Sequence, residues 1–135
     1  MPVLDASLVT AMFHERDAHH PAALRWYEEA RRNARPLYAP SLLLAEVAAA
    51  LTRSADAAET AARAVDLIVA QPLVALVPVA GSLVARAAHI CIQQRLKGCD
   101  AIYVALAAEL DDALITFDNE QLERGGAVAR VERPA

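Results

Sequence analysis

The sequence predicts an α/β fold in which a central parallel sheet of about five short strands is flanked by helices. First, short apolar segments alternate along the chain with longer segments of helical periodicity. Second, these apolar segments are too short and too uniformly apolar for an antiparallel sheet with one face in water, which indicates a sheet covered on both sides. Third, 135 residues with 56% hydrophobic and 22% charged side chains suit one domain with one core. We therefore expect a single domain over residues 1–135.

The first half of the chain predicts two strands and four helices. Apolar segments that end at a turn former or lie between prolines are expected to be strands, and amphipathic or helix-forming segments are expected to be helices. Ser41 and Asp56 are expected to cap the third and fourth helices, which then form a hairpin. In chain order, the expected elements are a strand at Val3-Leu4, a helix over 7–13, a helix that begins around His20 and includes Arg32, a strand over 37–39, and helices over 42–53 and 56–70.

The second half of the chain continues the alternation and ends on a strand. Gly98 is expected to break the chain between two helices, and Asp100 is expected to open the second of them. In chain order, the expected elements are a strand over 74–77, a helix from 82 to about 95, a helix over 100–110, a strand over 113–116, a short helix over 120–124, and a strand over 128–131.

Two aspartates follow predicted strands. Asp5 comes directly after the first strand, and Asp118 comes shortly after the fourth. The carboxyl ends of parallel strands meet at one edge of a sheet, where open α/β sheets bind their ligands, so we expect these two carboxylates to lie at one rim. Taken singly, either residue is explained equally well as a turn former or as a helix N-cap.

Two further carboxylates stand in apolar helices. Glu46 is the only charged residue between Tyr38 and Arg53, and Asp100 is followed by eight residues without a charge. Burial of an unpaired carboxylate is costly, so such a group needs a cation, a metal ion or an exposed edge. The alternative interpretations are a solvated helix stripe for Glu46 and an N-cap for Asp100.

Convergence of these four carboxylates would predict a metal site. Their charges would raise one another's pKa values and destabilise the fold unless a cation lay between them. An all-oxygen site suits Mg²⁺ or Mn²⁺, whereas zinc or copper would call for His or Cys. Such a site indicates phosphoryl-ester chemistry, because a bound metal ion generates hydroxide from water and stabilises the leaving oxygen.

Four segments of the sequence resemble the ordered acidic motifs of PIN-domain nucleases. They are Asp5-Ala6-Ser7, Glu46 in its apolar helix, the segment LKGCDAIYVA over 96–105, and Thr116-Phe117-Asp118. The third motif is the most specific, and Cys99 departs mildly there from the small residue expected before the acid. Among PIN domains, the sequence is most similar to the small single-domain VapC-type toxins, which are ribonucleases of type II toxin–antitoxin pairs.

This resemblance implies a PIN-like fold and a metal-dependent endoribonuclease that hydrolyses RNA phosphodiester bonds with metal-activated water. The implied catalytic residues and Mg²⁺ or Mn²⁺ ligands are Asp5, Glu46, Asp100 and Asp118, and the implied orienting hydroxyls are Ser7 and Thr116. The resemblance also implies a homodimer and a VapB-like antitoxin whose tail occupies the active-site groove.

Charge and hydropathy limit the cellular setting. A net charge of −4 argues against a broad basic surface for nucleic acid, but it does not exclude a nuclease whose metal ions offset its carboxylates. Every apolar run is much shorter than the ~20 residues that cross a bilayer, and the N-terminus has no basic segment followed by a long apolar one. We therefore expect a cytoplasmic protein without a membrane partner.

Two other functions compete with the nuclease. One is a catalytically silent PIN-fold binding or regulatory module, although such a copy would be expected to have lost a carboxylate. The other is a haloacid-dehalogenase-like phosphatase with Asp5 as its nucleophile and with Asp111-Asp112 and Lys97 nearby. Ser7 stands where that family needs its second aspartate, which argues against the phosphatase.

Basic residues outside the acidic motifs receive simpler interpretations. The spacing of His14, His19 and His20 is not that of a helical zinc motif, so these residues are expected in a polar loop. Arg86 and Arg95 are open to two interpretations, either as contacts to a phosphate backbone or as solvated helix charges.

Overall fold

The computed structural model describes residues 1–53, 58–70 and 73–135 of the chain. Strands and helices alternate in the predicted order. The elements are β1 (Val3–Leu4), α1 (Ala6–Phe13), α2 (His20–Arg32), β2 (Tyr38–Pro40), α3 (Leu43–Thr52), α4 (Ala58–Ala70), β3 (Ala75–Val77), α5 (Gly81–Gln94), α6 (Gly98–Leu110), β4 (Leu114–Ile115), α7 (Asn119–Arg124), the 3₁₀ turn η1 (Gly125–Ala127) and β5 (Val131–Glu132).

All strands of the five-stranded sheet are parallel, in the order β3-β2-β1-β4-β5. The predicted α/β class is therefore confirmed. From β1 the chain passes outward through β2 to β3, and it then returns to the other side of β1 to form β4 and β5. The strand order reverses between β1 and β4, so a crevice for ligands is expected beyond the carboxyl ends of these two strands.

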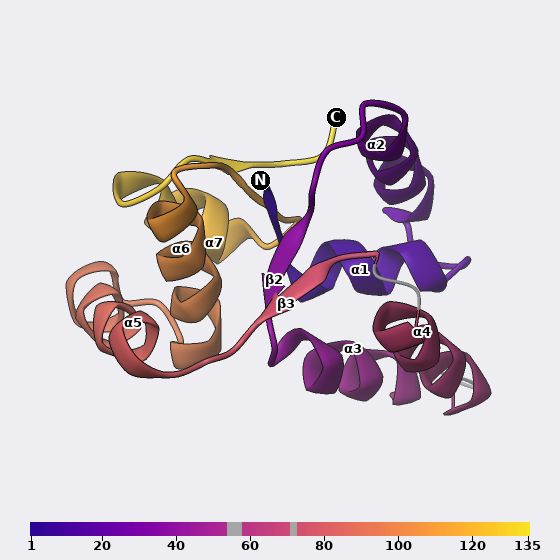
Figure 1. Cartoon of the computed structure of the whole chain (residues 1–135), viewed down its shortest axis with the longest axis horizontal. Coiled ribbons are helices and arrows are strands. Elements are labelled where there is room, and N and C mark those ends of the chain that lie inside the picture. Colours follow the sequence, from indigo (N-terminus) through magenta and orange to yellow (C-terminus); the bar gives the residue numbers. More distant parts are fainter. Residues whose placement is uncertain (54–57, 71–72) are drawn as a thin grey trace.

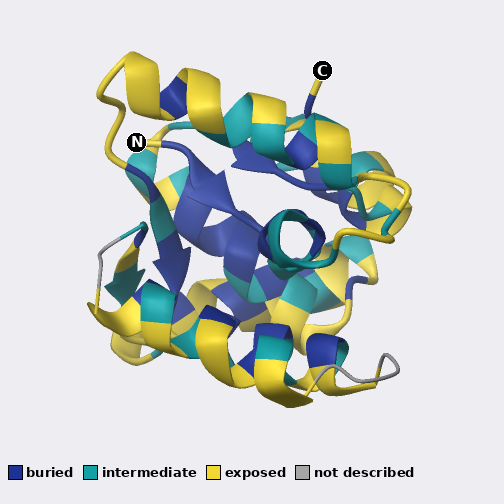
Figure 2. Cartoon of the chain, turned by 90° about the vertical axis from the view of Figure 1, so that its right-hand side faces the viewer, coloured by how far each residue is buried: buried dark blue, intermediate teal, exposed yellow. Residues whose placement is uncertain are grey.

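Helices cover both faces of the sheet, with α1 to α4 on one side and α5 to α7 on the other (Figure 1). Helix α3 packs on α4, as the predicted hairpin requires, and α5 packs on α6. The strands are buried between helices that turn their buried residues inward and their exposed residues outward (Figure 2). More residues are buried in α6 than in any other described helix, and Asp100 lies in the first turn of this helix.

The last strand begins later than predicted because a glycine turn precedes it. Gly125 packs so closely on α6 that an added Cβ would lie 2.9 Å from Cγ2 of Val104. The N–H of Val128 donates to the carbonyl of Gly125 at 3.0 Å, so Val128 belongs to this turn. The predicted strand over 128–131 was therefore misplaced, and β5 comprises Val131–Glu132.

Helix starts also differ from the sequence predictions. The predicted cap Ser41 is wrong, since helix α3 has Leu42 at its N-cap without a side-chain cap. The N–H of Ser41 donates to the carbonyl of Val77 and continues the pairing of β2 with β3. Helix α6 begins at Gly98, so Asp100 is its third residue and the N-cap interpretation of Asp100 is wrong. The predicted cap Asp56 lies outside the described residues. None of the described helices is long and apolar enough to span a membrane.

Candidate active site

The carboxyl ends of β1 and β4 place Asp5 and Thr116 in contact. Asp5 follows β1, and its backbone N–H donates to the carbonyl of Ile115 at 3.0 Å. Thr116 follows β4, and its hydroxyl lies 3.0 Å from Oδ2 of Asp5. The exposed fractions are 6% for Asp5 and 0% for Thr116. A buried carboxylate therefore lies at the carboxyl ends of β1 and β4, where the strand order predicts a ligand site.

Neutral donors hold both oxygens of the Asp5 carboxylate. Oδ2 accepts hydrogen bonds from the N–H of Ser7 and the hydroxyl of Thr116, both at 3.0 Å. Oδ1 accepts a hydrogen bond of 3.2 Å from Nε2 of Gln121. Asp5 is also the N-cap of α1, so the capping role considered for it is real and coexists with its place at the carboxyl end of β1.

Ser7 and Thr116 connect α1 to the segment after β4. Their hydroxyl oxygens lie 3.2 Å apart. Ser7 Oγ accepts a hydrogen bond from the N–H of Phe117, and Thr116 Oγ1 accepts one from the N–H of Asp118. Asp118 is in turn the N-cap of α7, where its Oδ1 accepts from the N–H of Gln121 at 2.9 Å. These bonds fix the spacing between the backbones that carry Asp5 and Asp118.

Gln121 is a site residue that the sequence analysis missed. Its side chain is fully buried, and its Oε1 lies 2.7 Å from the hydroxyl of Thr116, whose single proton it shares with Oδ2 of Asp5. Its Nε2 donates to Asp5 and also lies 3.5 Å from the backbone carbonyl of Asp100. The spacing of Asp118 and Gln121 is that of a capping box, which was a signal available in the sequence. Thr116 already satisfies the N–H of Asp118, so the glutamine side chain is free to reach Asp5.

Tyr103 is the second missed residue, and it connects α6 to α3. Its hydroxyl donates a 2.6 Å hydrogen bond to Oε1 of Glu46, while its side chain is only 1% exposed. A buried tyrosine in an apolar helix usually finds a partner for its hydroxyl, so its presence between Ala101 and Ala108 was an available signal. Burial raises the pKa of Glu46, the hydrogen bond from Tyr103 lowers it, and the charge of Asp5 raises it; the net effect is a raised pKa.

Asp100 shows most clearly that the predicted carboxylates share one region. Burial raises the pKa of Asp100 to about 6, and the negative charges of Asp118, Asp5 and Glu46 add to the effect. Lys97 acts in the opposite direction. The three other predicted acids therefore all lie close enough to Asp100 to act on its charge.

The chemistry of these four side chains fits a hard divalent cation. They offer carboxylate oxygens, and their mutual repulsion is what a bound cation would relieve. Among the described residues, however, no three His, Cys, Asp or Glu side chains are already arranged to hold a metal ion.

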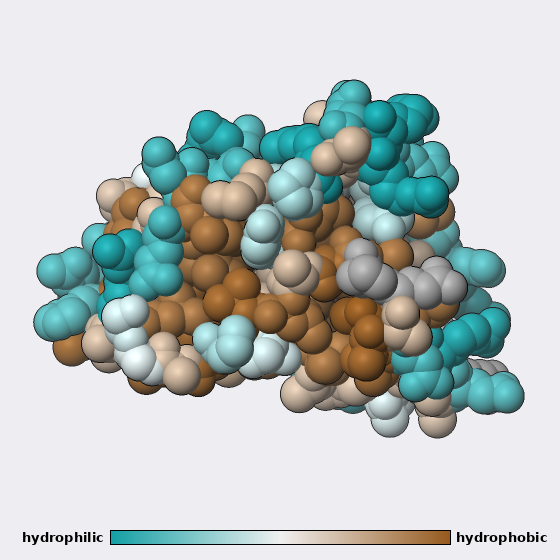
Figure 3. All heavy atoms as spheres, in the orientation of Figure 1, coloured by the Kyte–Doolittle hydropathy of each residue, from teal (hydrophilic) through white to brown (hydrophobic). Residues whose placement is uncertain are grey.

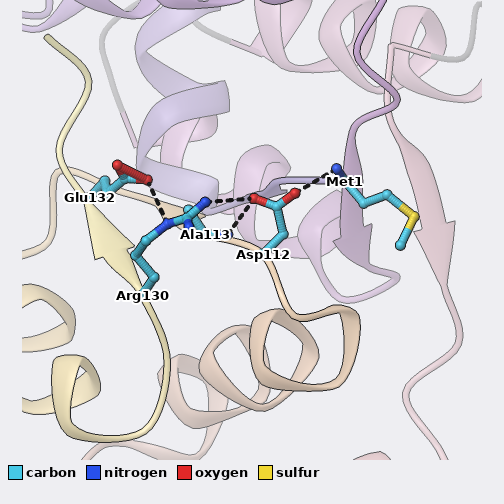
Figure 4. A network of polar contacts seen from close by, with 5 residues as sticks. All are labelled: Met1, Asp112, Ala113, Arg130 and Glu132. Carbon is cyan, nitrogen blue, oxygen red and sulfur yellow. Dashed lines mark hydrogen bonds and ion pairs between the residues drawn. The ribbon is translucent and has the colours of Figure 1, made fainter.

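The phosphatase interpretation is wrong because its residues lie at opposite ends of the sheet. Asp112 precedes β4, whereas Asp5 follows the parallel strand β1. Asp112 instead binds the ammonium group of Met1 at 2.7 Å and the guanidinium group of Arg130 at 3.2 Å (Figure 4). Lys97 precedes α6 and acts on Asp100.

The other basic residues lie outside the carboxylate cluster. His19 lies in the loop between α1 and α2, where its ring stacks on Phe117. His20 is the first residue of α2 and not a loop residue as predicted, and its Nδ1 lies 2.7 Å from the carbonyl oxygen of Ala11. Arg86 is exposed on α5, and Arg95 is exposed at its C-cap. A phosphate contact by either arginine stays a prediction.

Fold and site together define an α/β protein with a cluster of carboxylates near the switch point of a parallel sheet. Residues 3–127 match the PIN domain family, and the chain belongs to that family. The resemblance to PIN domains that the acidic motifs indicated is therefore confirmed. Comparison with curated proteins gives no significant match.

Solved structures with similar folds include toxins and toxin–antitoxin complexes. The VapC20 toxin of Mycobacterium tuberculosis, which cleaves the sarcin-ricin loop, has a TM-score of 0.75 at 18% identity, with 91% of this chain and 95% of that chain covered. FitAcB of Neisseria gonorrhoeae has a TM-score of 0.76 at 14% identity, with 99% and 98% covered. VapBC2 of Rickettsia felis, solved with a DNA fragment from its promoter, has a TM-score of 0.74 at 11% identity, with 98% and 97% covered.

Proposed function

We propose that this chain is a VapC-type toxin, an endoribonuclease that uses Mg²⁺ or Mn²⁺ to hydrolyse RNA phosphodiester bonds in the cytoplasm. The observation that supports the proposal best is the raised pKa of Asp100, which burial and three neighbouring carboxylates bring to about 6 at the strand switch point. A fold does not retain such repulsion for its own stability, so the cluster points to a cationic ligand. The similarity to the VapC20 toxin supports a ribonuclease among the hydrolases that such a site could serve.

The carboxylates of Asp5, Glu46, Asp100 and Asp118 would hold the metal ion. When bound, a divalent ion supplies a water of lowered pKa and a counter-charge for the phosphate oxygens. The neighbouring residues keep the carboxylates in place for this task. Tyr103 orients Glu46, while Ser7, Thr116 and Gln121 fix Asp5, so each hydrogen bond reduces the reorganisation needed on binding.

The proposed partners are a VapB-like antitoxin and a second copy of the chain. Two structures with folds similar to this chain support an antitoxin partner, because both are toxin–antitoxin complexes bound to DNA fragments. They are VapBC2 and FitAB. Figure 3 shows apolar atoms gathered across the face where β3 forms the edge of the sheet.

Cleavage of labelled total RNA by the purified, partner-free protein tests the proposal. We expect cleavage with Mg²⁺ or Mn²⁺, none with chelator, and none by Asp100→Asn. Circular dichroism of each preparation shows whether the protein is folded. A folded wild-type protein that cuts no RNA with either metal would reject the toxin function and favour the silent binding module.

A further inference from the structure

A groove beside the carboxylate cluster contains two stacked aromatic rings that the proposed chemistry does not use. The groove has a volume of about 360 Å³, and Glu46 and Ser7 form the part of its lining that belongs to the site. His19 and Phe117 also line it, with ring centroids 4.2 Å apart and ring planes inclined by 12°. The groove is therefore continuous with the site and carries an aromatic surface.

Hydrogen bonds on both sides hold this aromatic pair in place. The N–H of His19 donates to Oδ1 of Asp17 at 2.7 Å, and the ring of His20 binds the carbonyl of Ala11 and ties the start of α2 to α1. On the other side, the N–H of Phe117 donates to Oγ of Ser7 at 3.0 Å. A ligand that stacks on this pair has little ordering of the protein to offset.

The two rings differ in exposure. Phe117 is half-buried, whereas His19 is exposed. Since Phe117 covers one face of the imidazole, the opposite face of His19 is left for another planar group. Single-stranded RNA offers such groups, because its unpaired bases stack on aromatic side chains.

A cationic group in the groove suits the phosphate of a nucleotide. Thr10 also lines the groove, but its Oγ1, which has no hydrogen-bond partner within the described part of the chain, is shielded from solvent, so the cation of Arg53 is the polar contact that the groove offers. Arg53 lines the same groove and provides a cation for a phosphate oxygen.

We propose that this groove binds a nucleotide of single-stranded RNA next to the scissile phosphate, with its base stacked on the His19–Phe117 pair. The inference rests on the proposed ribonuclease function and assigns part of its substrate recognition. Stacking accepts any base, so the groove secures an unpaired nucleotide beside the carboxylates and rejects a continuous duplex.

His19→Ala and His19→Phe test the stacking, with His89→Ala on α5 as a matched control, because His89 is also exposed and lies outside the groove. We expect His19→Ala to raise KM for a short single-stranded RNA roughly tenfold with kcat little changed, because loss of one stacked base weakens binding by about that factor. His19→Phe retains a stacking ring and should keep the wild-type KM. Folding of the variants is checked by circular dichroism.

A second readout does not depend on cleavage. A single-stranded RNA hexamer that contains 2-aminopurine is titrated in the presence of Ca²⁺, and we expect its fluorescence to be quenched by the wild-type protein and by His19→Phe but not by His19→Ala. If the wild-type protein binds the hexamer without cutting RNA, the proposed function fails and the groove assignment stands.

Two outcomes would overturn the groove assignment. One is unchanged KM and unchanged quenching in His19→Ala. The other is unchanged RNA binding together with weaker binding of the purified antitoxin, which would assign the groove to protein recognition.

Discussion

The pKa values of two aspartates at opposite ends of the sheet are shifted in opposite directions. At the carboxyl end, burial and the charges of three other carboxylates raise the pKa of Asp100 to about 6. At the amino end, burial acts to raise the pKa of Asp112, but hydrogen bonds from the Met1 ammonium and the Ala113 N–H and the charge of Arg130 lower it below its usual range. The two aspartates lie at opposite ends of the segment formed by α6 and the turn before β4.

This difference separates a carboxylate kept for stability from one kept for a ligand. Asp112 has two cationic partners, and Arg130 also binds Glu132 at 3.3 Å, so the amino end forms a charge network complete in itself. At the carboxyl end, Asp5 and Glu46 receive hydrogen bonds from neutral donors instead. Neutral donors position a carboxylate without cancelling its charge, and the cluster therefore stays ready to attract a cation.

The sharpest test of the comparison is catalytic. Asp100→Asn should lower the rate of RNA cleavage by more than about a hundredfold, because it removes a charge that the metal ion needs. Asp112→Asn makes the same chemical change at the other end and should leave the rate within about twofold of wild type, since surface changes away from a site have small effects. The measurement is initial cleavage rate at saturating Mg²⁺. Equal losses in both variants would remove the functional distinction between the ends.

The neutral donors provide the next test. Tyr103→Phe removes one hydroxyl from a buried ring and leaves Glu46 without that hydrogen bond. Loss of an orienting partner behind a metal ligand typically costs about 10- to 100-fold in metal affinity or activity. We expect a loss in this range that is partly recovered at high Mn²⁺ concentration. A loss that Mn²⁺ leaves unchanged would mean that Tyr103 acts on packing and not on the position of Glu46.

Stability in chelator tests the repulsion itself. The folded-state pKa of Asp100 lies above its ordinary value of 3.8, so its contribution to stability is complete below pH 4 and is lost as the pH rises through about 6. Asp100→Asn removes the repelling charge and should raise Tm at pH 7 by a few degrees, or about 1 kcal/mol, with no gain at pH 4. Thermal melts from pH 4 to 8 give this profile. A lower Tm at pH 7 would show that Asp100 stabilises the fold.

The smallest expected effect is at the amino end. Asp112→Asn should lower stability by about 0.5–1 kcal/mol, because partly exposed ion pairs contribute little and are screened by salt. The sign of the pH dependence is opposite to that of Asp100. The pKa of Asp112 is lowered in the folded state, so its contribution is present at neutral pH and is lost as the pH falls below its usual range. Denaturant melts at pH 7, with and without roughly 0.5 M salt, measure the loss and its screening, and melts at decreasing pH measure how the loss disappears.

The four carboxylates could be singled out in the sequence because of their local setting, and their role as metal ligands stays a prediction. Asp5 and Asp118 follow strand ends, and Glu46 and Asp100 are lone charges in apolar helices. Tyr103 and Gln121 were missed because their roles depend on partners far away in the chain, Glu46 for the tyrosine and Asp5 for the glutamine. Alternation and helix periodicity carry no information about such pairs.

Element boundaries failed where tertiary contacts outweighed local preference. Val128 has the β-branched character of a strand residue, yet the turn at Gly125 includes it. Ser41 has the character of an N-cap, yet its N–H extends the sheet. In both cases a neighbouring strand or helix decides the outcome.

Gly125 allows the end of α7 to pack closely on α6, because it has no Cβ that would meet Val104. Helix α7 has Asp118 at one end and Gly125 at the other, and it rests on the helix that carries Asp100. A methyl group at position 125 would meet Val104 at 2.9 Å and push the two helices apart. A side chain at position 125 would therefore disturb the packing between the helix that Asp118 caps and the helix that carries Asp100.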